Sequence, residues 1–418
     1  MTKNIFSYIA FVAINSSIPF FTMPILTRNL SPDQYGSVTI FGVYASIIGA
    51  LIGFSTLTAF IKIYFNERYD NRVYLTTTIL ISFISTLLLL FIAYFFDESV
   101  SEMYGIPLWW IYGGIFMVFF DSIISAQSIL FRMEEKIFYF GIFDFSRIAL
   151  RALLMIYLVV FLDFKEDGVI ISGVLSSSIF LAFTFYLLFK NGAMSININR
   201  VYMKHALNFG LPLTPHVIFG VLSTMIDKIT IAYLLSKEEL GLYAVGFAIG
   251  AIIKALEAAV YQAYQPWFFK EISSKNCDNK KIVRFSYLIV TALLITSLIL
   301  SLISYSYFEL YVGKNYGSGV DIIPWIAFGF AVNGMYTMVN QVVLYEEKTH
   351  VISVITVLSV LLGVALNYVL INLNGVIGAA QAFLLLMAIR AIIMWIYSNN
   401  LHPLGWFNKV RPNFRTAT

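Results

Sequence analysis

The chain has little of what a soluble or extracellular protein needs. Only 12% of its 418 residues are charged, 59% are hydrophobic, and Cys277 is the single cysteine. So few charges cannot cover a soluble globule of 47.3 kDa, and a lone cysteine excludes an intramolecular disulfide. The sequence also lacks a G-x-x-x-x-G-K-[ST] phosphate loop, an H-E-x-x-H zinc motif and a cysteine cluster. We therefore expect no enzyme activity, no cofactor and no metal site.

What the sequence does contain is a series of long apolar runs. Each is long enough, at a rise of about 1.5 Å per residue, to cross a hydrocarbon layer of about 30 Å. The runs are continuously apolar rather than alternating, which favours helices over the strands of a β-barrel. We predict an all-α polytopic membrane protein with about twelve transmembrane helices, at roughly 5–26, 36–61, 74–96, 108–131, 139–161, 168–189, 209–235, 241–266, 285–307, 321–344, 351–371 and 375–397.

The basic residues of the connections indicate an orientation. With the N-terminus inside, the cytoplasmic segments hold 18 Lys and Arg residues and the external loops hold 4. Short basic loops stay on the cytoplasmic side, so both termini are predicted there, as is Cys277 in its Lys-rich connection. The net charge of +4 is then a marker of topology, and no nucleic-acid partner is expected.

Two short stretches suggest an internal duplication. "LSPDQYG" at residues 30–36 recurs as "LSKEELG" at 235–241, and each contains a capping box, Ser31 with Gln34 and Ser236 with Glu239. Each box precedes a predicted span, the second and the eighth. A unit of six spans returns the chain to its starting side, which predicts two pseudo-symmetric six-helix bundles around a central cavity. We assign residues 1–200 and 201–400 to these lobes and 401–418 to a basic cytoplasmic tail. Chance convergence of two capped loops is the alternative.

Charged residues also fall inside the predicted spans. Each one costs roughly 2.5–3.5 kcal/mol at the centre of a helix, so most should face protein or a wet cavity. The basic ones are Arg147, Arg151, Lys228, Lys254 and Arg390, and the acidic ones are Asp121, Asp144, Asp227 and Glu257. The excess of cations predicts a cavity for an anionic substrate, with the acids as counter-charges or as sites of proton or cation coupling.

Local neutralisation is the alternative for each of these groups. Asp144 could pair with Arg147, Asp121 with Arg151, and Lys254 with Glu257. Arg390 and Lys228 lie close enough to the ends of their helices for their side chains to reach the membrane surface.

Two segments carry a family resemblance. "MPILTRNLSPDQYGSVTIF" at residues 23–41 and "FGLPLTPHVIFGVLSTMIDKITIAYLLSKEELGLYAVGFAIG" at 209–250 resemble the Wzx-type flippases of O-antigen or capsule repeat units, in the MOP exporter superfamily. The resemblance implies transport of an undecaprenyl-diphosphate-linked oligosaccharide from the cytoplasmic to the periplasmic leaflet of the bacterial inner membrane, by alternating access. It also implies a cationic cavity, with Arg28, Lys228 and Lys254 at the matching positions, and coupling to H⁺ or Na⁺. Other membrane proteins of polysaccharide assembly are its expected partners.

Three rival functions remain open. A multidrug or organic-cation antiporter of the same superfamily would prefer an acidic cavity, yet the first two spans carry no carboxylate. A lipid II flippase usually has two additional C-terminal helices. A membrane polymerase of polysaccharide units would carry a long external loop, and the longest one here has only about a dozen residues.

Overall fold

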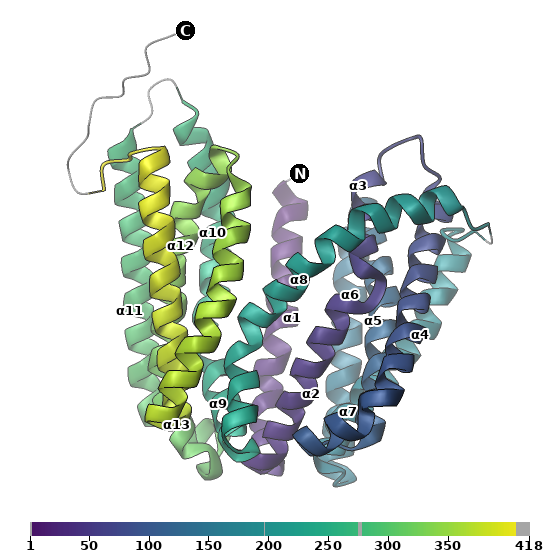
Figure 1. The fold of residues 1–418 in the computed structure, drawn as a ribbon, viewed down its shortest axis with the longest axis horizontal. Coiled ribbons are helices and arrows are strands. Elements are labelled where there is room, and N and C mark those ends of the chain that lie inside the picture. Colours follow the sequence, from purple (N-terminus) through teal and green to yellow (C-terminus); the bar gives the residue numbers. More distant parts are fainter. Residues whose placement is uncertain (1, 196, 275–277, 407–418) are drawn as a thin grey trace. The chain divides into compact units, whose positions relative to one another are not determined.

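The structure, a computed structural model, describes residues 2–195, 197–274 and 278–406. Every regular element within these ranges is a helix (Figure 1). The predicted all-α polytopic class is therefore confirmed. Cys277 and the tail beyond residue 406 lie outside the described residues.

Nine helical segments of the described ranges are long and apolar enough to cross a membrane. Three elements account for the difference between these nine segments and the twelve predicted spans. Helix α13 (Thr349–Leu401) is interrupted at Gly375, which has a φ of 57°, and covers two predicted spans. Helix α6 (Ile137–Ile156) carries three charged residues within 20, which lowers its hydropathy. Helix α1 (Thr2–Asn29) covers the first predicted span.

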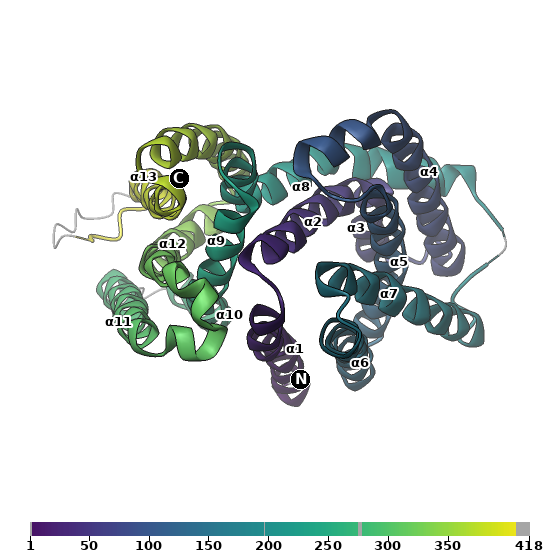
Figure 2. The same ribbon diagram turned by 90° about the horizontal axis from the view of Figure 1, so that it is seen from below.

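The chain divides into two compact units, and the first comprises Met1–Met225. It holds α1, α2 (Pro32–Leu51), the 3₁₀ turn η1 (Ile52–Ser55), α3 (Thr56–Ile63), α4 (Asn71–Tyr104), α5 (Leu108–Met133), α6, the π-helical turn η2 (Tyr157–Phe161), α7 (Lys165–Lys190) and most of α8 (Arg200–Leu234). Helix α5 contacts both α4 and α7, and α1 packs on α6 (Figure 2). The buried Trp110 of α5 donates a hydrogen bond of 2.8 Å to Asp167 of α7. These contacts place the charged faces of α5 and α6 inside one bundle.

The second unit comprises Ile226–Thr418. It holds the end of α8, α9 (Lys237–Gly250), α10 (Ile252–Ile272), α11 (Asn279–Val312), the 3₁₀ segment η3 (Lys314–Ile322), α12 (Ile323–Tyr345) and α13. Helix α12 contacts α9, α10, α11 and α13, and its Val339 and Val343 are fully buried against Met394. The boundary between the two units falls within α8, after Met225. The six-helix lobes with a boundary after residue 200 stay a prediction.

Both repeated stretches form the caps that their sequences predict. The Ser31 hydroxyl accepts from Gln34 N at 3.3 Å, and the Gln34 side chain accepts from Ser31 N at 2.9 Å. Ser236 and Glu239 make the same reciprocal bonds, at 3.2 and 3.3 Å. These boxes begin α2 and α9, because each satisfies two backbone N–H groups that a helix N-terminus leaves unpaired.

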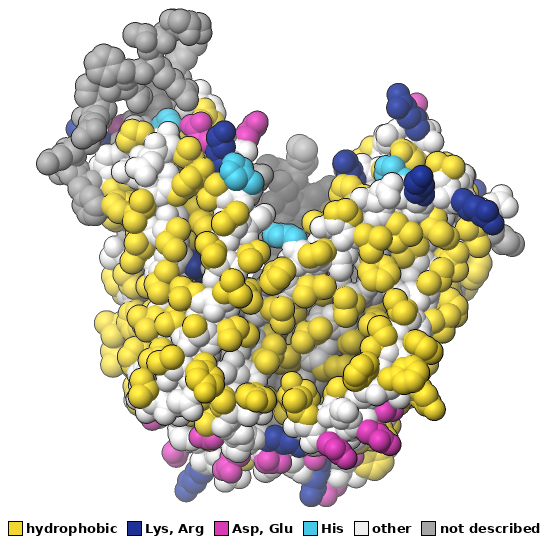
Figure 3. All heavy atoms as spheres, in the orientation of Figure 1, with side chains coloured by type: hydrophobic (Ala, Val, Ile, Leu, Met, Phe, Trp, Pro, Cys, Tyr) yellow, Lys and Arg dark blue, Asp and Glu magenta, His cyan; other side chains and the backbone are white. Residues whose placement is uncertain are grey.

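The surface reflects a membrane environment. Figure 3 shows acidic and basic side chains gathered toward the ends of the helices, with hydrophobic side chains between them. Leu87, Phe91 and Leu302 are half or more exposed. Large apolar side chains exposed in this way are compatible with a hydrocarbon environment, whereas in water they would promote aggregation.

Candidate functional site

The first charged cluster lies in unit 1, around Asp121 of α5. Its Oδ1 atom is 3.2 Å from Nη1 of Arg147 on α6 and accepts a 2.9 Å hydrogen bond from Ser177 on α7. Asp121 and Arg147 retain 27% and 29% of their side-chain exposure. The Nε of Arg147 is buried and has no hydrogen-bond partner among the described residues. The arginine therefore keeps a donor beyond the one that Asp121 takes.

Arg151 adds a second guanidinium to this cluster. It lies one turn beyond Arg147 on α6 and interacts electrostatically with both Asp121 and Arg147. Together with Asp121 it lines a pocket of about 390 Å³ whose other lining is mostly apolar, from α2, α5 and α7. With Arg147 included, the cluster around Asp121 holds one carboxylate and two guanidinium groups, and so carries a net positive charge.

Asp144 does not pair with Arg147, although their spacing on one helix made that pair possible. Its Oδ1 accepts a 2.6 Å hydrogen bond from Ser128 on α5, while Arg147 pairs with Asp121. Both α6 residues point to α5, so the partner of each is decided by which α5 side chain lies opposite.

The second charged cluster lies in unit 2, around Glu257 of α10. This glutamate is only 6% exposed and accepts hydrogen bonds from Asn333 at 2.9 Å and Thr337 at 2.5 Å, both on α12. It interacts electrostatically with Lys254 and Arg390. One buried carboxylate again lies within electrostatic range of two cations.

The two cations of this cluster differ in their surroundings. Lys254 is exposed, with its Nζ 5.9 Å from the centre of the Phe330 ring. Arg390 stacks on Tyr336, with 4.7 Å between the guanidinium carbon and the ring centre. The Nε of Arg390 is buried without a hydrogen-bond partner among the described residues. Both cations therefore have capacity for an anionic ligand.

Lys228 sits in a closed polar pair. Its Nζ lies 3.4 Å from Asp227 and 3.8 Å from the centre of the Phe247 ring. Tyr243 donates a 2.5 Å hydrogen bond to the same carboxylate oxygen. Because the lysine side chain is only 12% exposed, its charge is already matched in this structure. Arg28 is exposed in the last turn of α1.

Several polar partners in these clusters were not among the residues singled out from the sequence. They are Ser128, Ser177, Tyr243, Asn333 and Thr337. Asn333 and Thr337 are four residues apart in an apolar run, so they share one helix face, and that spacing is a signal the sequence does contain. The single serines and the tyrosine carry no comparable pattern.

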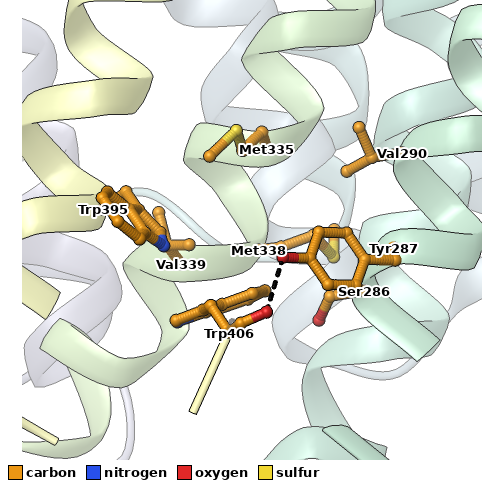
Figure 4. Close-up of a pocket in the computed structure, with 8 residues that line it drawn as sticks. All are labelled: Ser286, Tyr287, Val290, Met335, Met338, Val339, Trp395 and Trp406. Carbon is orange, nitrogen blue, oxygen red and sulfur yellow. Dashed lines mark hydrogen bonds between the residues drawn. The ribbon is translucent and has the colours of Figure 1, made fainter. Parts of the chain in front are cut away.

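An apolar pocket of about 200 Å³ lies elsewhere in unit 2, between α11, α12 and α13. Figure 4 shows Trp406 beside it, with its backbone oxygen accepting a 2.9 Å hydrogen bond from Tyr287. Met335, Met338 and Val339 supply much of the remaining lining. No charged side chain lines this pocket, so an anion has no partner here, and the two charged clusters are the better candidate site.

Known proteins resemble the chain over most of its length. The family model described as polysaccharide biosynthesis protein matches residues 1–272, and the MatE model matches residues 212–369. A protein of the Lsg locus of Haemophilus influenzae is 22% identical over 360 residues, which cover 83% of this chain and 86% of that protein.

Two solved structures show the same fold. One is a multidrug resistance MATE family transporter of the MOP superfamily in an inward-facing conformation, with a TM-score of 0.72 and 12% identity, covering 96% of this chain and 99% of that one. The other is the lipid II flippase MurJ, with a TM-score of 0.73 and 13% identity, covering 94% and 86%.

Proposed function

Because this chain belongs to the polysaccharide biosynthesis protein family, we propose that it is a flippase for lipid-linked polysaccharide repeat units. Its substrate would be an oligosaccharide on undecaprenyl diphosphate, moved from the cytoplasmic to the periplasmic leaflet by alternating access. The observation that carries this proposal is the pair of charged clusters, in each of which one carboxylate lies within electrostatic range of two cations.

A diphosphate fits these clusters chemically. Guanidinium groups bind phosphate oxygens through paired N–H donors, and an ammonium group binds them as a point charge. Arg151 and Lys254 are exposed, and Arg147 and Arg390 each retain an unpaired buried Nε. Keeping such charges at membrane depth costs several kcal/mol, and an anionic substrate offsets that cost. Arg28 and Lys228 are proposed as further contacts to the substrate on the basis of the family resemblance alone.

The carboxylates are proposed to couple the cycle to an ion gradient. Asp121 pairs with Arg147, Glu257 lies within electrostatic range of Lys254 and Arg390, and both carboxylates accept hydrogen bonds from neighbouring helices. A proton or Na⁺ bound to either carboxylate would neutralise it. Its attraction for the neighbouring cations would then be lost, and the net charge facing the substrate would become more positive. Asp144 and Asp227 have partners of their own and are assigned as counter-charges.

The MatE match over residues 212–369 supports a second candidate, an antiporter of organic cations. Such a substrate needs carboxylates without cationic partners. Asp121 and Glu257 both lie beside cations, which favours the anionic substrate. The fold shared with MurJ makes a lipid II flippase a further alternative, and its diphosphate head would suit the same clusters.

We place the protein in the bacterial inner membrane with both termini in the cytoplasm. The support for this orientation is the excess of Lys and Arg in the segments on that side. Other membrane proteins of polysaccharide assembly are proposed partners, since the translocated unit must be passed on.

Lys254→Ala tests the proposed substrate. In a strain that lacks the chromosomal gene, we expect surface polysaccharide to fall at least about tenfold, because one of two cations beside Glu257 is lost. Lys254→Arg should retain part of the activity. Lys270→Ala is the matched control, since Lys270 is exposed in the last turn of the same helix.

Membrane accumulation is measured by immunoblot alongside the polysaccharide. Normal surface polysaccharide with Lys254→Ala would show that Lys254 is no substrate ligand. Unchanged polysaccharide on gene deletion, with lost resistance to cationic drugs, would favour the antiporter.

A further inference from the structure

Helix α2 is broken within the second predicted span. The helix ends at Leu51, and α3 begins at Thr56. Between them, in η1, Gly53, Phe54 and Ser55 have φ values of 73°, 45° and 56°. Positive φ is uncommon for residues with a side chain, and two of these three carry one. The surroundings must therefore hold this backbone in place.

Hydroxyl groups supply much of that support. Ser85 of α4 accepts a 2.8 Å hydrogen bond from Gly53 N, and Thr56 donates one of 2.6 Å to Gly53 O. A Cβ on Gly53 would lie 2.6 Å from the Ser82 hydroxyl oxygen. Ser82, Ser85 and Thr56 are at most 3% exposed. Irregular backbone at membrane depth is tolerated where protein satisfies its polar groups, and this break is satisfied in that way.

The break also approaches α8 closely, and the nearest atom to Gly210 is a backbone oxygen of the break. A Cβ on Gly210 would lie 2.2 Å from Phe54 O and 3.2 Å from Thr56 N. Only glycine fits at this position without displacing the backbone of the break. Beside it, Nζ of Lys62 on α3 lies 4.8 Å from the centre of the Phe209 ring.

Helix α8 continues from this contact into the second unit. It runs from Arg200 to Leu234, and the boundary between the units falls after Met225. Pro212 and Pro215 lie two and five residues after Gly210. Each proline removes a backbone donor and weakens the helix, so α8 can bend just beyond its contact with the break.

We propose that Gly53, Phe54, Ser55 and Gly210 form a joint, the α2–α8 joint, through which bending of α2 is transmitted to α8. The closest approach, between Gly210 and Phe54 O, joins two backbones without a flexible side chain, so a displacement of one helix is transmitted directly to the other. The joint thus links α2, which lines the Arg151 pocket, to the helix shared by both units. The role of the joint in a transport cycle rests on the proposed function, whereas the coupling between α2 and α8 rests on the local geometry.

Spin-label distances test the joint without any substrate. Labels are placed on cysteines at Asp33 of α2 and Thr224 of α8, both exposed, in a chain with Cys277→Ser. Distance distributions are recorded in lipid nanodiscs at pH 5.5 and pH 7.5, with and without Na⁺. We expect at least two populations whose ratio changes with these conditions, and a single population in Gly210→Ala.

Gly220→Ala is the matched control, because Gly220 lies in the same helix with nothing within 4 Å of its Cβ position. It should keep the populations of the parent. Ser85→Ala removes the hydrogen bond to Gly53 N without adding volume, and it should also alter the population ratio. It serves as the test variant should Gly210→Ala fail to accumulate. Distributions in Gly210→Ala and Ser85→Ala that match the parent would overturn the joint, as would a single unchanging population in the parent.

The same experiment separates this inference from the proposed substrate. A chain that proved to export cationic drugs would still show the coupled distances. Parent-like distance distributions in Gly210→Ala and Ser85→Ala, with normal polysaccharide transport, would refute the joint and leave the flippase proposal intact.

Discussion

Asp121→Asn is the most informative single change in unit 1. The carboxylate lies 3.2 Å from the Arg147 guanidinium, and at an effective dielectric constant of about 20 their attraction is about 5 kcal/mol before desolvation is subtracted. Because both side chains are partly exposed, we expect a net loss of about 1–3 kcal/mol in the free energy of unfolding. The substitution also leaves Arg147 and Arg151 facing each other without a counter-charge.

A double-mutant cycle isolates the pair. Asp121→Asn, Arg147→Met and their combination are compared by thermal unfolding in one detergent, where about 1 kcal/mol corresponds to a shift of about 1–2 °C for a chain of this length. The double variant should lose at least about 1 kcal/mol less than the sum of the single variants, since removing both charges leaves neither one unpaired.

Asp144 provides the control cycle. It lies one turn from Arg147 on the same helix but bonds to Ser128, so Asp144→Asn and Arg147→Met should be additive within about 0.5 kcal/mol. Additivity of the Asp121 and Arg147 variants, or coupling of Arg147 to Asp144 instead, would refute the assigned pairing.

Two further predictions concern the helix caps and the topology. Ser31→Ala and Ser236→Ala should each lower the free energy of unfolding by about 0.5–2 kcal/mol, because each removes one arm of a capping box; Ser46→Ala, whose hydroxyl bonds only within its own helix, is the control in thermal unfolding. Cys277 should react with a membrane-impermeant thiol reagent in inverted vesicles and not in intact spheroplasts, and labelling from outside would contradict the proposed orientation.

The capping boxes illustrate what local sequence can predict. Ser31 with Gln34, and Ser236 with Glu239, form their reciprocal hydrogen bonds within four residues of chain. No distant partner takes part, so residue type and spacing were sufficient. The spans were predictable for a related reason, since continuous apolar composition over about 20 residues is itself what the bilayer selects.

The pairing of charges was not predictable in the same way. Spacing on one helix placed Asp144 beside Arg147, yet Arg147 bonds to Asp121 on α5. Likewise Glu257 takes its hydrogen bonds from Asn333 and Thr337, some 80 residues away. These partners depend on how neighbouring helices are rotated and how closely they approach.

The sequence by itself therefore determined the helical class, the starts of α2 and α9, and the presence of charged groups at membrane depth. Only the tertiary structure decided which carboxylate each cation faces and where α2 breaks. The break depends on Ser85 of α4 and Gly210 of α8, residues far from it in the chain. The physical reason is that caps and apolar length are satisfied within one helix, whereas ion pairs and irregular backbone are stabilised by groups that packing alone brings together.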